Sequence, residues 1–229
     1  MTTDDRPSVV RIGVLASGEG TNSQAILDAC ARGEVPGQVV VVVSNKPGAR
    51  ALERARAAGV PAVLLDHRAY ADRQAFEQHL AEVLKTHAVD LVCLAGFLRI
   101  LSPWFVAQFP GRIMNIHPAL LPSFGGRGMY GAHVHETVLA YGVKVSGCTI
   151  HFVDDTPDGG PIILQAAVPV RDDDTPSTLA ARIAAQEHHL YPEAVTLFAA
   201  GRLRVEGRRV RILLTSHESQ VTSHVKTRP

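Results

Sequence analysis

The sequence predicts an α/β fold: a Rossmann-like open sheet, mostly parallel and twisted, with helices on both faces. Short apolar runs rich in β-branched residues, such as 8–15 and 39–43, are typical of buried parallel strands. Stretches of helical period, such as 68–87, lie between these runs. A glycine-rich loop, 16–22, joins the first expected strand to the first expected helix, a place where α/β folds bind anions. This alternation predicts a parallel sheet.

Local chemistry sets the bounds of each expected element. Apolar runs that stop at glycine or proline predict strands, and apolar residues at helical spacing predict helices. The expected strands are 8–15, 39–43, 61–65, 90–95, a run ending at His117, 143–153 and 162–170. The expected helices cover Ala25 to Ala29, 48–58, 68–87, a short helix with Trp104, Phe105 and Phe109 in the core, and a helix that opens at Thr175.

Two further features belong to the C-terminal part. The helix that opens at Thr175 is expected to end near Tyr191-Pro192, where another helix can start, because proline interrupts helical hydrogen bonding. Gly207 between two short apolar runs predicts a small hairpin.

A chain of 229 residues is long enough for one large α/β domain. We expect that domain at 8–215, with an N-terminal half, 8–95, and a C-terminal half, 96–215. The polar ends, 1–7 and 216–229, are expected to be disordered.

Composition narrows the function classes. A formal net charge of +1 gives no reason to expect nucleic acid. The N-terminus is unlike a signal peptide, and the apolar runs are only strand-length, so neither export nor a membrane is expected. Cys30, Cys93 and Cys148 are odd in number and far apart, which predicts small buried side chains in a reducing cytoplasm.

The glycine loop fits neither of two well-known phosphate motifs. A Walker A loop needs Lys-Ser or Lys-Thr where this chain has Glu19-Gly20. The dinucleotide fingerprint lacks its third glycine, since Ser23 takes that place, and 44–46 lacks the acidic residue that binds ribose. We therefore expect a single phosphate group here, or else a tight turn before an ordinary helix.

Asn115 and His117 form the pair on which the functional prediction depends. They alternate with Ile116, so both side chains lie on the same face of a strand that must stop at Pro118. Side-chain donors at a strand's carboxyl end suit an oxyanion that forms on a carbonyl under attack. The alternative is a hydrogen-bonded Asn and a satisfied core His.

Other loops leave alternatives open. The apolar segment after Gly96 either walls a flat heterocycle or covers the core. The glycine-rich loop 123–131 is either a mobile lid or a rigid irregular loop. The histidines at 133, 135, 188 and 189 lack metal-ligand spacing, and we expect surface or capping roles and no metal site.

Four motifs carry a resemblance to a known family. They are Gly20-Thr21-Asn22, Gly96 to Leu101, Asn115-Ile116-His117-Pro118 and Asp158-Gly159-Gly160-Pro161. In this order and spacing the chain resembles the phosphoribosylglycinamide formyltransferases, folate-dependent enzymes of purine biosynthesis. The resemblance covers roughly 9–205. It implies a formyltransferase fold with a phosphate-binding N-terminal half and a catalytic, folate-binding C-terminal half.

The resemblance also implies the site residues. Asn115, His117 and Asp158 match the catalytic trio of the family. The segment Gly20, Thr21 and Asn22 matches the loop that binds the substrate phosphate, and Gln186 and Glu187 match the segment that contacts the ribonucleotide. The folate site is expected to use Arg73, Leu98, Arg99, Ile100, Leu101, Asn115 and Asp154. Two departures are Ala184, where some members have Gln, and a longer loop at Gly125–Gly131.

The implied reaction transfers the formyl group of 10-formyltetrahydrofolate, a co-substrate, to the amine of 5-phosphoribosylglycinamide. We expect small-molecule partners, a possible homodimer and no metal. Asp158 is expected to raise the pKa of His117 and to prevail over burial. The alternatives are another formyl-folate enzyme, such as formyltetrahydrofolate hydrolase, and a non-catalytic nucleotide-binding module.

Overall fold

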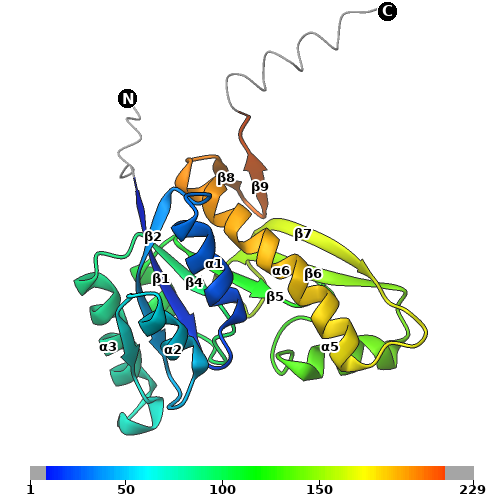
Figure 1. The fold of residues 1–229 in the computed structure, drawn as a ribbon, viewed down its shortest axis with the longest axis horizontal. Helices are drawn as coiled ribbons and strands as arrows, with labels where there is room; N and C mark the ends of the chain where they lie inside the picture. Colours follow the sequence, from blue (N-terminus) through cyan, green and yellow to red (C-terminus); the bar gives the residue numbers. More distant parts are fainter. Residues whose placement is uncertain (1–8, 215–229) are drawn as a thin grey trace, which may run out of the picture.

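A nine-stranded sheet forms the centre of the molecule, in the order β3-β2-β1-β4-β5-β6-β7-β9-β8 (Figure 1). The structure, a computed structural model, describes residues 9–214. The expected disordered ends, 1–7 and 216–229, lie outside the described residues. No helix in the described part of the chain is long and apolar enough to cross a membrane.

The predicted strands are confirmed, each to within two residues at either end. The strands are β1 Val10–Ala16, β2 Gly37–Ser44, β3 Ala62–Leu64, β4 Leu91–Leu94, β5 Ile113–His117, β6 Val145–Phe152, β7 Ile162–Pro169, β8 Leu203–Glu206 and β9 Arg209–Ile212. The helices are α1 Thr21–Ala31, α2 Arg50–Ala57, α3 Arg73–Thr86, α4 Pro103–Gln108, α5 Ala132–Tyr141 and α6 Pro176–Ala199. The expected hairpin at Gly207 is present as β8 and β9, which pair antiparallel.

Strand direction changes in the middle of the sheet. β3, β2, β1, β4 and β5 pair in parallel, whereas β6 is antiparallel to both β5 and β7. The chain builds outward from β1 in both directions, so β1 and β4 flank the switch point where open α/β sheets bind ligands. β5 lies next to this point, and its carboxyl end carries Asn115 and His117.

Alternate side chains of the strands build a core on each face. Ile12 and Val14 of β1 pack with α1, α2 and α6, while Leu15 packs with α3 and α4. Figure 1 shows α1 and α6 crossing the near face of the sheet. A third cluster joins α5 and the first turns of α6 to β6 and β7. The predicted fold class, with helices on both faces, is confirmed.

The helix expected over 68–87 begins later than predicted. Residues His67–Ala69 form one turn of 3-10 helix, whose cap Asp66 accepts a hydrogen bond from the backbone of Arg68. Asp72 then caps α3, and its side chain accepts from the N–H of Ala75 at 2.8 Å. Two successive caps therefore divide the segment that helical spacing alone joined together.

The predicted end of the last helix near Tyr191 is wrong. α6 continues through Pro192 to Ala199. Proline removes one helical hydrogen bond and costs about 3 kcal/mol in a helix interior. Burial offsets this cost, because Tyr191, Val195 and Phe198 are all buried against the sheet.

One core prediction on α4 is also wrong. Phe105 and Phe109 are buried, but Trp104 is 40% exposed. Ser102 caps the helix and Pro103 opens it, which turns Trp104 outward while Phe105 faces the sheet.

This contrast gives a stability test. Phe105→Ala empties a fully buried site and should lower the free energy of unfolding by about 3–5 kcal/mol. Trp104→Ala, the matched control on the same helix turn, should cost about 1 kcal/mol or less. Urea unfolding followed by circular dichroism makes the comparison, since Trp104 is the only tryptophan. Equal losses in the two variants would contradict the assignment of the core.

Candidate active site

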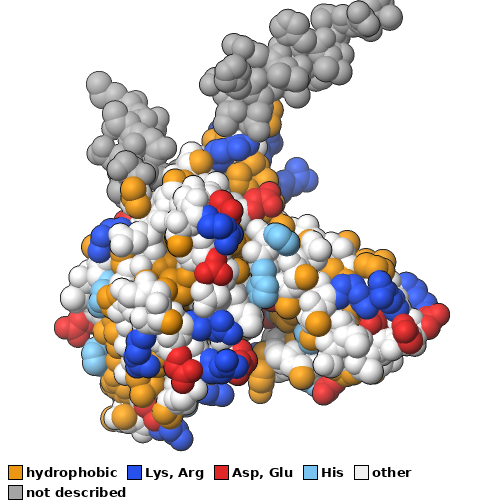
Figure 2. All heavy atoms as spheres, in the orientation of Figure 1, with side chains coloured by type: hydrophobic (Ala, Val, Ile, Leu, Met, Phe, Trp, Pro, Cys, Tyr) orange, Lys and Arg blue, Asp and Glu red, His pale blue; other side chains and the backbone are white. Residues whose placement is uncertain are grey.

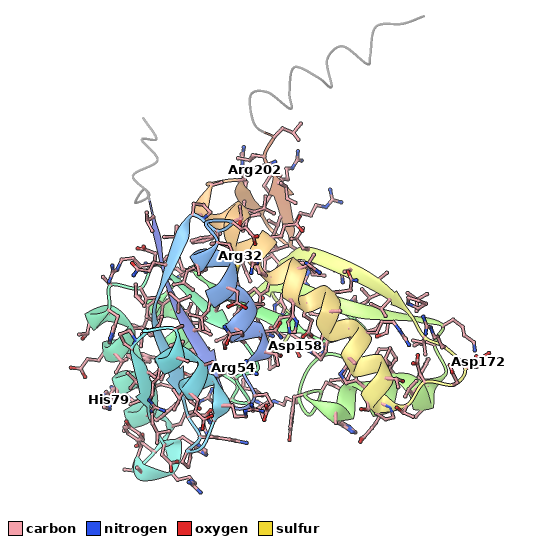
Figure 3. The ribbon with its side chains drawn as sticks, viewed as in Figure 1. Arg32, Arg54, His79, Asp158, Asp172 and Arg202 are labelled. Atoms are coloured by element: carbon pink, nitrogen blue, oxygen red, sulfur yellow. The ribbon has the colours of Figure 1, made fainter. Side chains whose placement is uncertain are left out.

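A cavity of about 690 Å³ opens at the carboxyl ends of the central strands. Its walls come from the first turn of α1, the segment after β4, the end of β5, the loop after β6 and the middle of α6. Asp158, in the loop after β6, lies near the centre of the molecule, where these elements meet (Figure 3). The cavity is therefore located where the sheet topology predicts a ligand site.

β5 presents its two functional side chains to this cavity. Met114 and Ile116 point into the core beneath α6, so Asn115 and His117 share the opposite face. His117 is only 3% exposed, whereas Asn115 is half-buried. The pairing predicted from alternation along the strand is present.

Asp158 joins the two side chains from a loop 41 positions beyond His117 (158 − 117). Its Oδ2 lies 3.5 Å from His117 Nδ1, and its Oδ1 accepts a weak hydrogen bond from Asn115 Nδ2 at 3.4 Å. The backbone N–H of Gly126 donates to Oδ2 at 2.9 Å. Burial alone would raise the pKa of Asp158, but the contacts with His151, His117 and Gly126 hold it below its usual value. Asp158 is thus ionised at neutral pH.

The backbone at Asp158 is unusual for a residue with a side chain. Its φ is 54°, in the left-handed region. Gly160 follows at a place where a Cβ would lie 1.8 Å from the carbonyl oxygen of Phe152, so only glycine fits. The Asp-Gly-Gly-Pro motif therefore supplies a carboxylate at 158 and also meets a steric requirement for glycine at 160.

Burial, rather than Asp158, decides the charge of His117. Its Nε2 lies 2.7 Å from the carbonyl oxygen of Phe124, which can only accept, so Nε2 carries a proton. Burial lowers the pKa of His117 below its ordinary value, and the charge of Asp158 offsets this only in part. The prediction that Asp158 would prevail is wrong, because the ring is enclosed more completely than a polar cleft suggested.

His151 is a residue of this cluster that sequence reasoning missed. It lies opposite Asn115 in the antiparallel pair of β5 and β6. Its Nδ1–H donates to the carbonyl of Phe152 at 2.8 Å, which leaves Nε2 to accept from Asn115 Nδ2 at 3.2 Å. His151 thereby fixes the orientation of the Asn115 amide. Only the pairing of β5 with β6 reveals this contact, and local sequence does not give it.

The glycine loop gives α1 an N-terminus without a side-chain cap. Gly20 has φ 70° and precedes the first helical residue, Thr21. Asn22 donates to Glu187 of α6 at 2.8 Å, and burial raises the pKa of Glu187 above its usual value. Asn22 and Glu187 line the main cavity, while Thr21 lines a second one of about 360 Å³. Of the predicted phosphate loop, only Asn22 therefore reaches the main cavity, beside the carboxyl of Glu187, and Gly20 lines neither cavity.

The apolar segment after β4 forms the opposite wall. Leu98 and Ile100 are each 44% exposed, whereas Leu101 is buried. The guanidinium of Arg99 lies 5.3 Å from the centre of the Phe76 ring. All four residues from Leu98 to Leu101 line the cavity, as do Arg73 and Asp154. This geometry favours the prediction that the segment is a cavity wall over the alternative that it only covers the core.

Gln186, His133 and His135 differ in how they lie relative to the cavity. The structure places Gln186 on the exposed side of α6, outside the cavity, because one helical residue away from Glu187 is a rotation of about 100°. His133 is exposed as expected, 3.5 Å from Glu136. The surface or capping role expected of His135 is wrong, since it is 7% exposed, lines the cavity and has a buried Nδ1 with no hydrogen-bond partner among residues 9–214. Within residues 9–214, no three His, Cys, Asp or Glu side chains gather as a metal site would.

Comparison with known proteins identifies the family. A family model described as formyl transferase matches residues 10–195. The chain belongs to the formyl transferase family. The matched residues run from the start of β1 into α6, so they include Asn115, His117, His151 and Asp158.

Individual formyl transferases are similar over most of the chain. The phosphoribosylglycinamide formyltransferase of Escherichia coli (strain K12) is 45% identical over 196 residues, which cover 86% of this chain and 90% of that protein. The crystal structure of glycinamide ribonucleotide transformylase 1 from Symbiobacterium toebii matches with a TM-score of 0.87 and 53% identity, over 93% of this chain and 99% of that one. The resemblance predicted from the motifs is confirmed.

A longer protein also matches. The trifunctional purine biosynthetic protein adenosine-3 of Bos taurus is 44% identical over 200 residues, or 87% of this chain. The chain spans 19% of the length of that relative.

The protonation of His117 can be measured directly. NMR titration of the ring should give a pKa below about 6.5, because burial disfavours the charged form. In Asp158→Asn the pKa should fall further, since the negative charge that partly offsets burial is removed. A pKa above the ordinary value, or one that rises in the variant, would contradict the assigned electrostatics.

Proposed function

We propose that this chain is a phosphoribosylglycinamide formyltransferase, which transfers the formyl group of 10-formyltetrahydrofolate to the amine of 5-phosphoribosylglycinamide in purine biosynthesis. The observation that carries the proposal is the convergence of Asn115, His117 and ionised Asp158 at the floor of one cavity. That cavity is lined by polar side chains such as Asn22 and Glu187 and by apolar side chains such as Leu98 and Ile100. The three free cysteines fit a reducing cytoplasm, where we place the reaction.

Asn115 and His117 supply the hydrogen-bond donors for the reaction. When an amine attacks a formyl carbon, negative charge develops on the formyl oxygen, and fixed donors stabilise it. His151 and Asp158 accept both Nδ2 hydrogens of Asn115, at 3.2 and 3.4 Å, so the formyl oxygen takes the place of the weaker contact, the one with Asp158. A neutral His117 is a sufficient donor, because its proton is on Nε2. The substrate oxygen must then replace the Phe124 carbonyl, whose residue has an unusual φ of 56°.

Asp158 is the base for the amine proton. The attacking nitrogen must lose a proton as the new C–N bond forms, and a carboxylate within the cavity accepts it directly or through His117. The bond between the formyl carbon and N10 of the folate then breaks, and N10 takes up a proton as tetrahydrofolate leaves. Its lowered pKa keeps Asp158 ionised, and the contact at 3.5 Å stabilises a transiently charged His117 ring. Asp158 thereby serves both proton transfer and charge stabilisation.

The two ends of the cavity suit the two substrates. The uncapped N-terminus of α1 presents N–H groups and the positive end of a helix dipole, which favour the ribonucleotide phosphate. Glu187, beside Asn22, suits hydroxyl groups of the ribose. The exposed Leu98 and Ile100 suit the flat pterin ring, and Asp154 lies at the edge of that wall. The residues present therefore fit a folate co-substrate.

One assay tests the reaction. The purified chain is mixed with both substrates, and the absorbance change is followed as formyl-folate is consumed. Consumption that depends on the ribonucleotide is expected. Formate release without the ribonucleotide would instead indicate a hydrolase, and ligand binding without turnover would indicate a binding module.

The catalytic trio can be tested by truncation. Asn115→Ala, His117→Ala and Asp158→Ala should each lower kcat at least about a hundredfold, because each removes a preorganised donor or the base. Steady-state kinetics measures the loss, and circular dichroism checks that the fold is intact. A folded His117→Ala enzyme with nearly normal kcat would refute the mechanism.

The phosphate loop offers a matched pair of glycines. A Cβ at Gly20 would lie 2.6 Å from the Cβ of Ala51, and the left-handed φ adds strain, so Gly20→Ala must displace the loop. A Cβ at Gly18 would meet nothing within 4 Å. Gly20→Ala should weaken ribonucleotide binding about tenfold or more while leaving folate binding unchanged, and Gly18→Ala should affect neither. Calorimetry that finds equal losses for both ligands would argue against separate sites.

A further inference from the structure

Glu77 is a buried carboxylate that the catalytic mechanism does not use. It lies on the inner face of α3, and its side chain is 3% exposed. Its Oε1 accepts from Arg73 Nε at 2.9 Å and from the backbone N–H of Ser102 at 3.0 Å, and its Oε2 accepts a short hydrogen bond from the Ser102 hydroxyl. A buried charge with this many donors joins two separate segments of the chain.

Arg73 continues this network toward the cavity. One terminal nitrogen, Nη2, donates to the carbonyl of Ile100, while Nε is held by Glu77. Nη1 forms no hydrogen bond with any of residues 9–214, and the side chain is 47% exposed. Because two of its nitrogens are fixed by the protein, the guanidinium is locked in one orientation at the cavity edge.

The apolar wall is fixed by the same contacts. The backbone N–H of Leu98 donates to the hydroxyl of Ser17 at 2.8 Å, which anchors the beginning of the segment. Ile100 is held by Arg73, and Ser102, which also caps α4, is held by Glu77. Leu98 and Ile100 remain exposed to the cavity although a free loop would turn such side chains inward. The wall is therefore held in place by the protein's own hydrogen bonds.

We propose that Glu77 is a positioning residue for the folate site, acting through Arg73 and Ser102 rather than by contact with substrate. Glu77 orients the Arg73 guanidinium so that its Nη1, free among residues 9–214, can bind a ligand carboxylate at the cavity mouth. The apolar wall from Leu98 to Leu101, which suits a flat ring, lies beside it. A folate carries both groups, since its pterin leads through a benzoyl group to a glutamate tail. The inference rests on the proposed function and adds the residue that organises recognition of the anionic tail.

Glu77→Gln tests the role in the full-length chain. The variant keeps the shape of the side chain but loses its charge, so Arg73 is no longer held by an ion pair. The KM for formyl-folate should rise about tenfold or more, while kcat and the KM for the ribonucleotide stay within about twofold of the wild type. Glu82→Gln removes a charge from an exposed position on the same helix, and all three constants should be unchanged. A folded Glu77→Gln enzyme with a normal folate KM would overturn the proposal.

A truncated ligand separates positioning from a general loss of structure. Calorimetry compares tetrahydrofolate with tetrahydropteroate, which lacks the glutamate. The wild type should prefer the ligand with the tail, Glu77→Gln and Arg73→Ala should each lose most of that preference, and the double variant should be no worse than Arg73→Ala alone. Equal weakening of both ligands and of the ribonucleotide would overturn the proposal.

A variant that does not fold and a wild type that does not bind folate can each be told apart from a failure of the Glu77 proposal. If Glu77→Gln fails to fold, Glu77→Asp, which keeps the charge but withdraws it by one methylene, should show the same loss of preference at a smaller size, and an unchanged preference would overturn the proposal. A wild type that binds neither folate would instead refute the proposed function itself.

Discussion

The carboxylate of Asp158 lies where three segments of the chain meet, and the geometry of the site depends on how its charge is held there. β5 brings Asn115 and His117 to one side, β6 brings His151, and the loop after β5 contributes the N–H of Gly126. An ionised carboxylate in a largely enclosed place is costly unless donors surround it. The N–H of Gly126 and the amide of Asn115 donate to the carboxylate, which offsets part of that cost and fixes the side chain at the positive φ of Asp158.

The reversal of strand direction makes this convergence possible. In a parallel pair the carboxyl end of β6 would lie beside that of β5. The antiparallel pair instead puts His151 directly opposite Asn115 and Phe152, the last residue of β6, opposite Met114. Asp158 follows six residues after Phe152 (158 − 152) and reaches Asn115 and His117 from this loop. The parallel half of the sheet carries Asn115 and His117, and the loop after the antiparallel strand β6 supplies the carboxylate.

The two walls of the cavity are fixed by buried polar contacts rather than by apolar packing alone. Glu77 and Ser17 hold the segment from Leu98 to Ser102, and Glu187 holds Asn22 at the end beside α1. On the face shown in Figure 2, acidic and basic side chains are interspersed, so this face provides no single strong electrostatic field.

The sequence by itself determined the strands, every helix except α5, the turn at Gly20 and the shared strand face of Asn115 and His117, because strand alternation, helical spacing and glycine geometry act over a few residues. The motif resemblance added Asp158. Tertiary structure decided the rest. It buried His117 enough to lower its pKa, paired Asn115 with His151, brought His135 into the cavity and left Gln186 outside it. Packing of Tyr191 against the sheet also carried α6 past Pro192. Each of these outcomes depends on contacts between distant segments, which local patterns in the sequence do not encode.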